Sequence, residues 1–369
     1  MNMPLNSMIS LRVTALFYHD ALIGALILTG TAVLCYGVWW FWGVIGENDS
    51  RAIVKIQPLS RRTNGYQALY WGLGVLWILD GLLQLQPAMP NSAFLEMVIA
   101  PLLSGQPTWF IHVLGGGIQA WSDAPILANI LAVYIQLGIG LILLLGRNRW
   151  WGRWGLWTTI GWGFFVWIWG EGLGMVLTPF ATMLQGDPGS VFFYMGSAVL
   201  LLASERWWLS GHMTRWIRWG LVGLWLWGAA MQALPGSGEW KSIGQIYRQS
   251  AQNPQPSFLS TPLYHLAHWA TVNPGWANGL VVLGLLALAM LWAGRPFGRV
   301  TMALSYGVLA FMWWAGQDFG VLGGVGTDLQ TAPILALIVS VGRLSRISDS
   351  GQAHGKGASV DAEAVVRSG

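Results

Sequence analysis

The feature that most constrains this chain is a series of apolar runs, each about 20 residues long and separated by short polar segments. A helix of about 20 apolar residues crosses the ~30 Å hydrocarbon core of a bilayer. Of the 369 residues, 54% are hydrophobic and only 9% are charged, whereas soluble domains carry about 25% charged residues. The sequence therefore predicts an all-α integral membrane protein whose immediate partner is the lipid bilayer.

Charge and cysteine content disfavour other classes of protein. The formal net charge is +4, but the basic residues are scattered among short loops. They do not form the basic stripe of a nucleic-acid binder, so no nucleic-acid partner is expected. Cys35 is the only cysteine, which excludes an intramolecular disulfide or a CxxC redox couple. A soluble enzyme and a disulfide-stapled secreted domain are both disfavoured.

The apolar runs predict nine transmembrane helices. The first run is too long for a cleaved signal peptide and lacks a small-residue cleavage site, so it is expected to be a retained helix. Two long segments, 87–124 and 235–274, connect spans on the predicted outer side, where short helices are expected to order them. The predicted spans are 18–46, 67–86, 125–146, 154–180, 190–204, 215–234, 275–293, 299–318 and 331–346.

The distribution of lysine and arginine predicts the orientation of these spans. If the N-terminus lies outside, every basic residue except Arg12, Lys241 and Arg248 lies on the cytoplasmic side, as the positive-inside rule requires. Nine spans then place the C-terminus in the cytoplasm. The tail after Arg346 is rich in Gly, Ser and Ala and is expected to be disordered.

The chain also contains an internal repeat, with shifts of 141 to 149 residues. Gln84 and Asn129 in the first copy, for example, correspond to Gln232 and Asn278 in the second. Each copy holds four predicted spans, so both copies enter the membrane from the same side, as in parallel-repeat membrane proteins. The predicted units are an N-terminal helix with a basic loop (1–66), two four-helix repeats (67–204 and 215–346) and the cytoplasmic tail (347–369).

Several strings in these repeats resemble a known family. They are the run Leu73–Gly81, the second hairpin Pro274–Arg299, and the helix-end strings Gly170–Gly174, Gly316–Gly320 and Gly326–Asp328. With them, the four-helix repeat resembles the DoxX/DoxD superfamily of small bacterial membrane proteins, here as a tandem duplication with an extra leading helix. The resemblance implies a bacterial inner-membrane protein linked to quinone-dependent thiosulfate oxidation or to a thiol redox complex.

Acidic residues inside or beside the spans are the first candidates for a functional site. An ionisable group in hydrocarbon costs roughly 2.5–3.5 kcal/mol on insertion scales, so its position is informative. Asp80, Glu171 and Asp318 all fall toward the predicted outer ends of their spans. They are candidate catalytic residues, because carboxyl groups in a poorly hydrated pocket can relay protons from an oxidised quinol. The alternative is solvation at the membrane interface.

Histidines in the long outer segments form a second group of candidates. His265 and His268 are spaced i, i+3, so on a helix they share a face, and imidazole suits copper, zinc or iron. They are the candidate metal ligands, and interfacial histidines bonded to backbone are the alternative. Gln317 and His112 are the candidate residues for binding a cofactor.

Three functions from different classes are compatible with these patterns. The first is an integral subunit of a quinone-dependent oxidoreductase, with its site at the outer leaflet and an extracytoplasmic or redox protein as partner. The second is a membrane transporter or metal-handling protein. The third is a non-catalytic scaffold for an extracytoplasmic partner. A quinone and a metal ion are the candidate cofactors.

Overall fold

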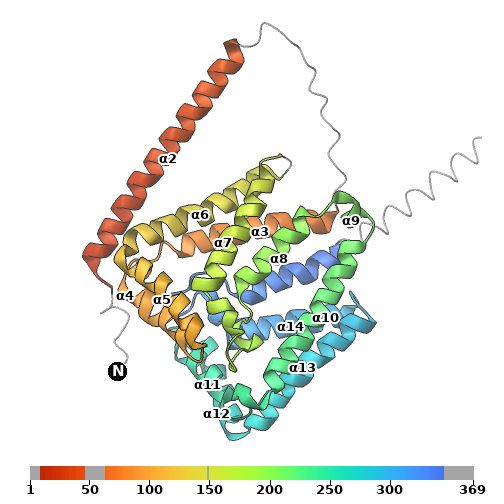
Figure 1. Ribbon diagram of the computed structural model, residues 1–369. Coiled ribbons are helices and arrows are strands. Elements are labelled where there is room, and N and C mark those ends of the chain that lie inside the picture. The colour runs from red at the N-terminus through yellow and green to blue at the C-terminus, as the bar shows by residue number, and fades with distance from the viewer. Residues whose placement is uncertain (1–8, 46–62, 148, 345–369) are drawn as a thin grey trace, which may run out of the picture.

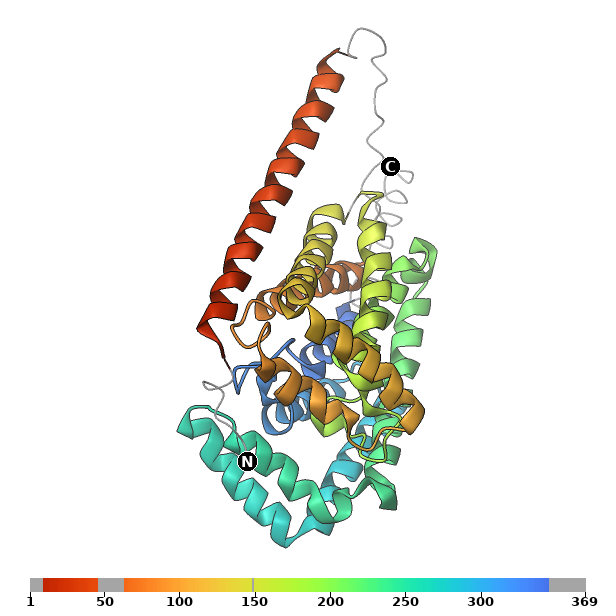
Figure 2. The same cartoon turned by 60° about the vertical axis from the view of Figure 1, so that its left-hand side comes forward.

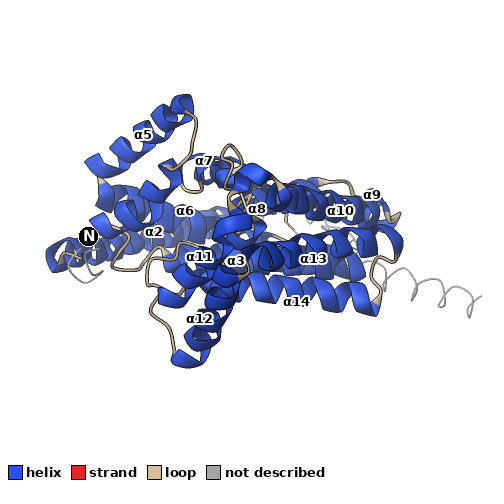
Figure 3. Ribbon diagram, turned by 90° about the horizontal axis from the view of Figure 1, so that it is seen from below, coloured by secondary structure: helices blue, strands red, loops and turns tan. Residues whose placement is uncertain are grey.

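The computed structural model describes residues 9–45, 63–147 and 149–344, and every regular element within these ranges is helical (Figure 3). The basic loop that contains Arg51 and Arg62, and the tail 347–369, lie outside the described residues. The expectation of an all-helical protein is confirmed for the part of the chain that is described.

Helices occupy all nine segments that were expected to span the membrane. Three of them, Leu11–Cys35, Pro125–Gly146 and Pro274–Gly294, are long and apolar enough to cross a bilayer by length and composition. The nine helices are α2 (Leu11–Ile45), α3 (Asn64–Leu83), α6 (Pro125–Gly146), α7 (Gly152–Trp169), α8 (Ser190–Leu202), α10 (His212–Ala233), α13 (Pro274–Gly294), α14 (Arg299–Ala315) and the helix Thr331–Leu344.

Shorter helices order the long connections between these elements. The first connection contains α4 (Ser92–Phe94), a π-helical turn (Leu95–Ile99), a 3-10 turn (Ala100–Leu103) and α5 (Thr108–Asp123). The second contains α11 (Glu239–Gln252) and α12 (Ser257–Val272). In Figures 1 and 3, α5, α11 and α12 lie at one end of the bundle, and α9 (Glu205–Leu209) lies at the other.

Glycine allows the closest helix contacts. Helix α3 packs along α6, and a Cβ at Gly140 would lie 2.8 Å from the carbonyl oxygen of Gly74. Small residues of this kind are typical of helix pairs in membranes, where backbones approach closely. Helices α10 and α13 form a second extensive pair, and the fully buried Trp225 and Trp292 on these two helices belong to the main hydrophobic core.

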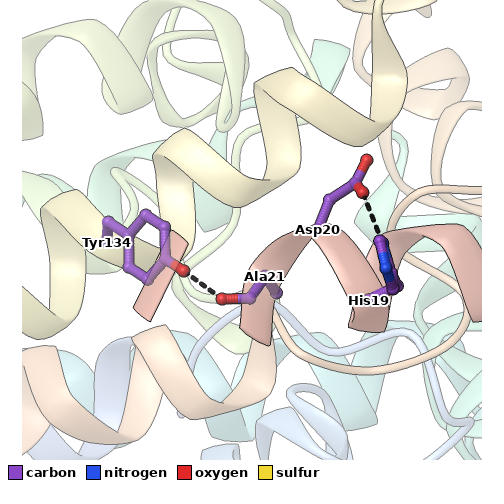
Figure 4. Close-up of polar contacts among 4 residues, drawn as sticks. All are labelled: His19, Asp20, Ala21 and Tyr134. Carbon is purple, nitrogen blue, oxygen red and sulfur yellow. Dashed lines mark hydrogen bonds and ion pairs between the residues drawn. The ribbon is translucent and has the colours of Figure 1, made fainter. Parts of the chain in front are cut away.

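Helix α2 stands apart from this bundle. Figures 1 and 2 show that it diverges from the other helices toward its C-terminal end, and Leu22, Leu26 and Leu34 expose 62%, 64% and 71% of their surface. Near its N-terminal end the Tyr134 hydroxyl of α6 donates to the carbonyl oxygen of Ala21 (Figure 4). An apolar helix with so little protein cover is suited to contact with lipid.

Two predicted spans end earlier than the apolar pattern indicates. The helix expected over 154–180 ends at Trp169. Beyond it the N–H groups of Gly170 and Glu171 both bond the carbonyl oxygen of Val166, which interrupts the regular helical pattern. Irregular segments then follow, with short 3-10 turns at Gly172–Met175, Met183–Gln185 and Asp318–Gly320. These two segments, 170–189 and 316–330, carry two acidic residues of the candidate site, Glu171 and Asp328.

Candidate functional site

Three carboxyl side chains that are far apart in the sequence converge inside the bundle. Asp80 lies in the last turn of α3, Glu171 follows the end of α7, and Asp328 precedes the helix Thr331–Leu344. Asp80 is 2% exposed and Asp328 is 9% exposed, and the Oε2 atom of Glu171 is buried without a hydrogen-bond partner. Asp80 is close enough to the other two for their charges to interact.

The hydroxyl of Ser190, the first residue of α8, bridges two of these carboxyl groups. Its Oγ atom lies 2.8 Å from Oε1 of Glu171 and 2.7 Å from Oδ2 of Asp328. A hydroxyl has one proton, so it can donate to only one carboxylate. It accepts from the other, and that group must itself be protonated. The arrangement Glu171–Ser190–Asp328, which we call the carboxyl bridge, therefore holds one carboxyl proton when both bonds are formed.

Backbone groups fix both ends of the carboxyl bridge. Oε1 of Glu171 accepts the N–H groups of Ser190 and Val191 at 3.0 and 3.3 Å, at the positive end of the α8 dipole. Oδ1 of Asp328 accepts the N–H of Gln330 at 2.6 Å. Burial raises the pKa of the Asp328 carboxyl above its ordinary value, and the bonds from Ser190 and Gln330 oppose part of that rise. Such a site can hold a proton under conditions in which an exposed aspartate is ionised.

The fit of Glu171 against α8 depends on a glycine. Gly189 has a φ of +99°, which L side chains rarely adopt. A Cβ at this position would lie 2.0 Å from Oε2 of Glu171. A residue larger than glycine would therefore displace the carboxyl group from the helix terminus.

A row of polar side chains extends from the carboxyl bridge along one face of α8. Ser190, Tyr194 and Ser197 are spaced i, i+4 and i+7, which places them on the same side over roughly 10 Å. All three are buried. The Tyr194 hydroxyl lies beside Asp80 without reaching hydrogen-bond geometry, and neither it nor the Ser197 hydroxyl has a hydrogen-bond partner.

This row ends at an apolar cavity of about 660 Å³ between α8, α10 and the helix Thr331–Leu344. Trp167, Phe192 and Trp216 contribute aromatic walls, and Ser197 supplies the hydroxyl of the lining. Gly220 lines the cavity from α10 and is exposed, so the cavity opens at the surface of the bundle. An apolar cavity with few polar groups is the usual form of a small-molecule site.

The structure separates Asp318 from the other two candidate acids. Its Oδ2 atom accepts the Asn253 amide at 2.6 Å, so Asp318 lies against α11. Gln317 takes a position like that of Glu171, because its Oε1 atom accepts the N–H of Ala332 at the start of the last described helix. The structure thus brings Asp80 and Glu171 together and places Asp318 elsewhere.

The candidate histidines lie on exposed faces of the short helices. The Nδ1 atom of His112 on α5 is 2.7 Å from the carbonyl oxygen of Thr108, one turn earlier. His265 and His268 are both exposed on α12. Within residues 9–45, 63–147 and 149–344, no three His, Cys, Asp or Glu side chains form a group that could hold a metal ion. Metal binding by this histidine pair stays a prediction.

Sequence patterns alone did not identify Ser190, Tyr194, Ser197 or Asp328 as parts of a site. The repeat pairs Asp187 with Asp328, a pattern that predicts helix N-caps. Asp328 does accept a backbone N–H two residues ahead, but its other oxygen reaches Ser190, 138 positions away. Only the fold brings these residues together, and no sequence signal distinguishes Ser197 from other serines.

The site is therefore interpreted from its own geometry, in which a proton-holding carboxyl bridge, a polar helix face and an apolar cavity adjoin one another. No protein-family model matches the chain, and neither a curated protein nor a solved structure shows significant similarity to it.

Proposed function

We propose that the protein is an integral membrane subunit of a quinone-linked redox complex, and that the cavity beside α8 binds the quinone ring. The observation that carries the proposal is the continuity between an apolar cavity and buried proton-holding groups. Ser197 lines the cavity, and Tyr194 and Ser190 connect it along one helix face to the carboxyl bridge.

The residues present fit a quinone. The volume of about 660 Å³ lies in the range of small-molecule sites, and aromatic walls suit a flat ring. Ser197 contributes to the wall of the cavity, and its hydroxyl is buried just behind that wall without a hydrogen-bond partner. The exposed glycines Gly196, Gly220 and Gly223 leave the cavity open on the outer surface of the helices, the side from which a lipid-soluble ligand arrives.

A bound quinone would supply two-electron, two-proton redox chemistry. The residues of this chain supply the means to hold and move protons. Ser197 offers a hydroxyl at the cavity, Tyr194 carries a second hydroxyl one turn closer to Asp80, and the carboxyl bridge holds a proton at its far end. Electrons would pass to a partner protein on the outer side, because Cys35 alone cannot form a redox disulfide within the chain.

Quinone titration of the full chain in neutral detergent tests the proposal. A Cβ at Gly220 would meet nothing within 4 Å, so Gly220→Leu fills the cavity without a backbone clash. We expect this variant to weaken the binding of a short-chain quinone, followed by tryptophan fluorescence, by about tenfold or more. Gly161→Leu on α7 is the matched control, because Gly161 is also open and does not line the cavity. Equal affinity in both variants would rule out this cavity as the quinone site.

A membrane transporter for a cation is the second candidate function. Asp80 favours it, because both of its carboxyl oxygens are buried without hydrogen-bond partners and a cation would satisfy them. Thermal stability with added cations or added quinone distinguishes the two candidate functions. A transporter would show cation-dependent thermal stability that Asp80→Asn abolishes, whereas the redox subunit would respond to quinone and not to added cations.

The finer architecture is part of the same proposal: nine spans, a DoxX-like tandem duplication, and an outside N-terminus in a bacterial inner membrane. Recurring hydrogen bonds support the duplication. The Asn129 amide donates to the carbonyl oxygen of Gln84, and the Asn278 amide donates to that of Gln232. Cysteine labelling of the segments 100–120 and 255–270 from outside intact cells tests the orientation, and labelling only after lysis would contradict it.

A further inference from the structure

A second cavity lies at the opposite end of the helices from α12 and is unrelated to the carboxyl bridge. It has a volume of about 620 Å³ and is formed where α10 begins and where the chain turns from α13 into α14. Three arginines line it, together with Thr214 and the turn residues that connect the two helices. Such a concentration of positive charge in a concave surface points to an anionic ligand.

One of the three arginines is held in place by the protein. The Nε atom of Arg218 donates to the carbonyl oxygen of Trp292 at 3.0 Å, and a terminal nitrogen donates to that of Ala293. Its guanidinium group also lies 5.0 Å from the ring centroid of Trp219. Arg218 therefore caps the C-terminal end of α13 and still carries its charge at the cavity.

The other two arginines are free to bind a ligand. Arg215 and Arg295 are exposed. In the portion of the chain that is described, the ion pair found joins His19 to Asp20, and none involves these arginines. A guanidinium group without a carboxylate partner keeps all of its donors for a ligand.

Two helix N-termini add to the positive potential of the same cavity. Gly211 and Gly298 line it, and they are the N-cap residues of α10 and α14, helices of 22 and 17 residues. Neither glycine supplies a capping side chain, and the first turn of each helix has no acidic residue. The first N–H groups of a helix are unpaired and bind anions, phosphate in particular.

A buried hydroxyl at the cavity is also without a partner. Oγ1 of Thr214 has less than 1 Å² of exposed surface and makes no hydrogen bond. Thr214 also lines the cavity, so this hydroxyl lies close to the wall against which an anion would bind.

We propose that this cavity binds a phosphate group. Exposed apolar side chains, among them Trp216, Trp219 and Met290, continue along α10 and α13. They would accompany the acyl chains of a lipid whose phosphate lies between Arg215 and Arg295. Basic pockets between transmembrane helices on the cytoplasmic side recognise anionic lipid headgroups in this way. Soluble phosphate carries the same chemistry, and the experiment separates the two sources.

The test uses the full chain in neutral detergent, with native mass spectrometry as the readout of bound lipid. Short-chain phosphatidylglycerol is titrated beside diacylglycerol, which has the same chains without phosphate, and inorganic phosphate is added as a competitor in a third arm. The variant Arg215→Gln/Arg295→Gln removes the two free guanidinium groups. The matched control Arg149→Gln/Arg153→Gln removes two exposed arginines, one from the turn between α6 and α7 and one from the first turn of α7. Neither lines the cavity.

We expect one phosphatidylglycerol per chain and an affinity about 25-fold lower in the cavity variant, roughly fivefold for each charge removed. The control should bind a single lipid almost as the parent does. Displacement of the lipid by millimolar inorganic phosphate would assign the site to soluble phosphate and would also support the proposal. Equal binding of diacylglycerol, or an equal loss of affinity in both double variants, would overturn it. Thr214→Val, which retains all charges, should weaken binding by a smaller factor.

Discussion

The hydroxyl of Ser190 and the carboxyl group of Asp328 lie 2.7 Å apart, although 138 positions separate them in the chain. Because the same hydroxyl contacts Glu171, it holds two acidic side chains together in a buried site. The segment after α7 and the segment before the helix Thr331–Leu344 are therefore connected through a single serine.

Removal of that hydroxyl should destabilise the protein. In Ser190→Ala the two carboxyl groups lose their shared partner, and hydrogen bonds to charged groups are worth about 1.5–3 kcal/mol. We expect a loss of this order, measured as a lower Tm in detergent, and partial recovery when Asp328→Asn is added. Ser197→Ala is the control, because Ser197 is buried on the same helix face without a hydrogen-bond partner. A similar loss in both alanine variants would argue against the carboxyl bridge.

The pH dependence of stability should report the raised pKa of Asp328. Burial raises this pKa in the folded protein, so the folded state binds the proton more tightly than the unfolded state does. The resulting stabilisation is complete below the pKa of an unfolded aspartate and is lost as the pH rises through the higher folded pKa. Asp328→Asn, which cannot ionise, should lose less stability than the parent as the pH rises above the ordinary aspartate pKa of about 4. Parallel curves for the two proteins would contradict this.

Local sequence patterns predict the helices well but only part of the candidate site, namely Asp80 and Glu171. Apolar runs identify the helical segments, and Pro125 and Pro274 mark helix starts because proline is favoured at the first helical position. The end of α7 is different. Leu173 and Met175 have φ values of +57° and +54°, a conformation that non-glycine residues adopt only when surrounding contacts impose it. Those contacts come from distant segments, and a single sequence carries no record of them.

The helix pair α3–α6 and its counterpart in the repeat, α10–α13, differ in a way that the repeat pattern does not reveal. Asn278 makes two bonds to Gln232, from its amide to the carbonyl oxygen and from the Gln232 amide to its Oδ1. Asn129 makes one bond to Gln84, and its Oδ1 has no partner. Identical residues at matched repeat positions therefore form different numbers of hydrogen bonds.

Alanine at each asparagine should reveal that difference. We expect Asn278→Ala to cost about 2 kcal/mol and Asn129→Ala about 1 kcal/mol, roughly 1 kcal/mol for each buried hydrogen bond. Thermal unfolding in detergent provides the comparison. A larger loss at Asn129 than at Asn278 would show that the hydrogen bonds are not what distinguishes the two positions.

The contact between α3 and α6 should depend on one glycine of α6 and not on its neighbour. A Cβ at Gly140 would lie 2.8 Å from the carbonyl oxygen of Gly74, whereas a Cβ at Gly138 would meet nothing within 4 Å. Gly140→Ala forces the backbones apart and should cost about 1–3 kcal/mol. Gly138→Ala should be neutral or stabilise by up to about 1 kcal/mol through helix propensity. Equal Tm values for the two variants would mean that the helices adjust without cost.

The position of α2 should depend on the hydrogen bond shown in Figure 4, in which the Tyr134 hydroxyl donates to the carbonyl oxygen of Ala21. This bond joins α2 directly to α6, whereas Ser10 and Tyr18 of the same end bond to Asn91 and to the carbonyl oxygen of Leu85. Tyr134→Phe should therefore broaden the distribution of α2 positions relative to α6. Spin labels at the native Cys35 and at Leu145→Cys allow this distance distribution to be measured, because both positions are exposed. Tyr306→Phe removes the Tyr306 hydroxyl, which contacts Ser340 and not α2, and should leave the distribution unchanged. An unchanged distribution in Tyr134→Phe would mean that apolar packing and the hydrogen bonds of Ser10, Thr14 and Tyr18 position α2 without it.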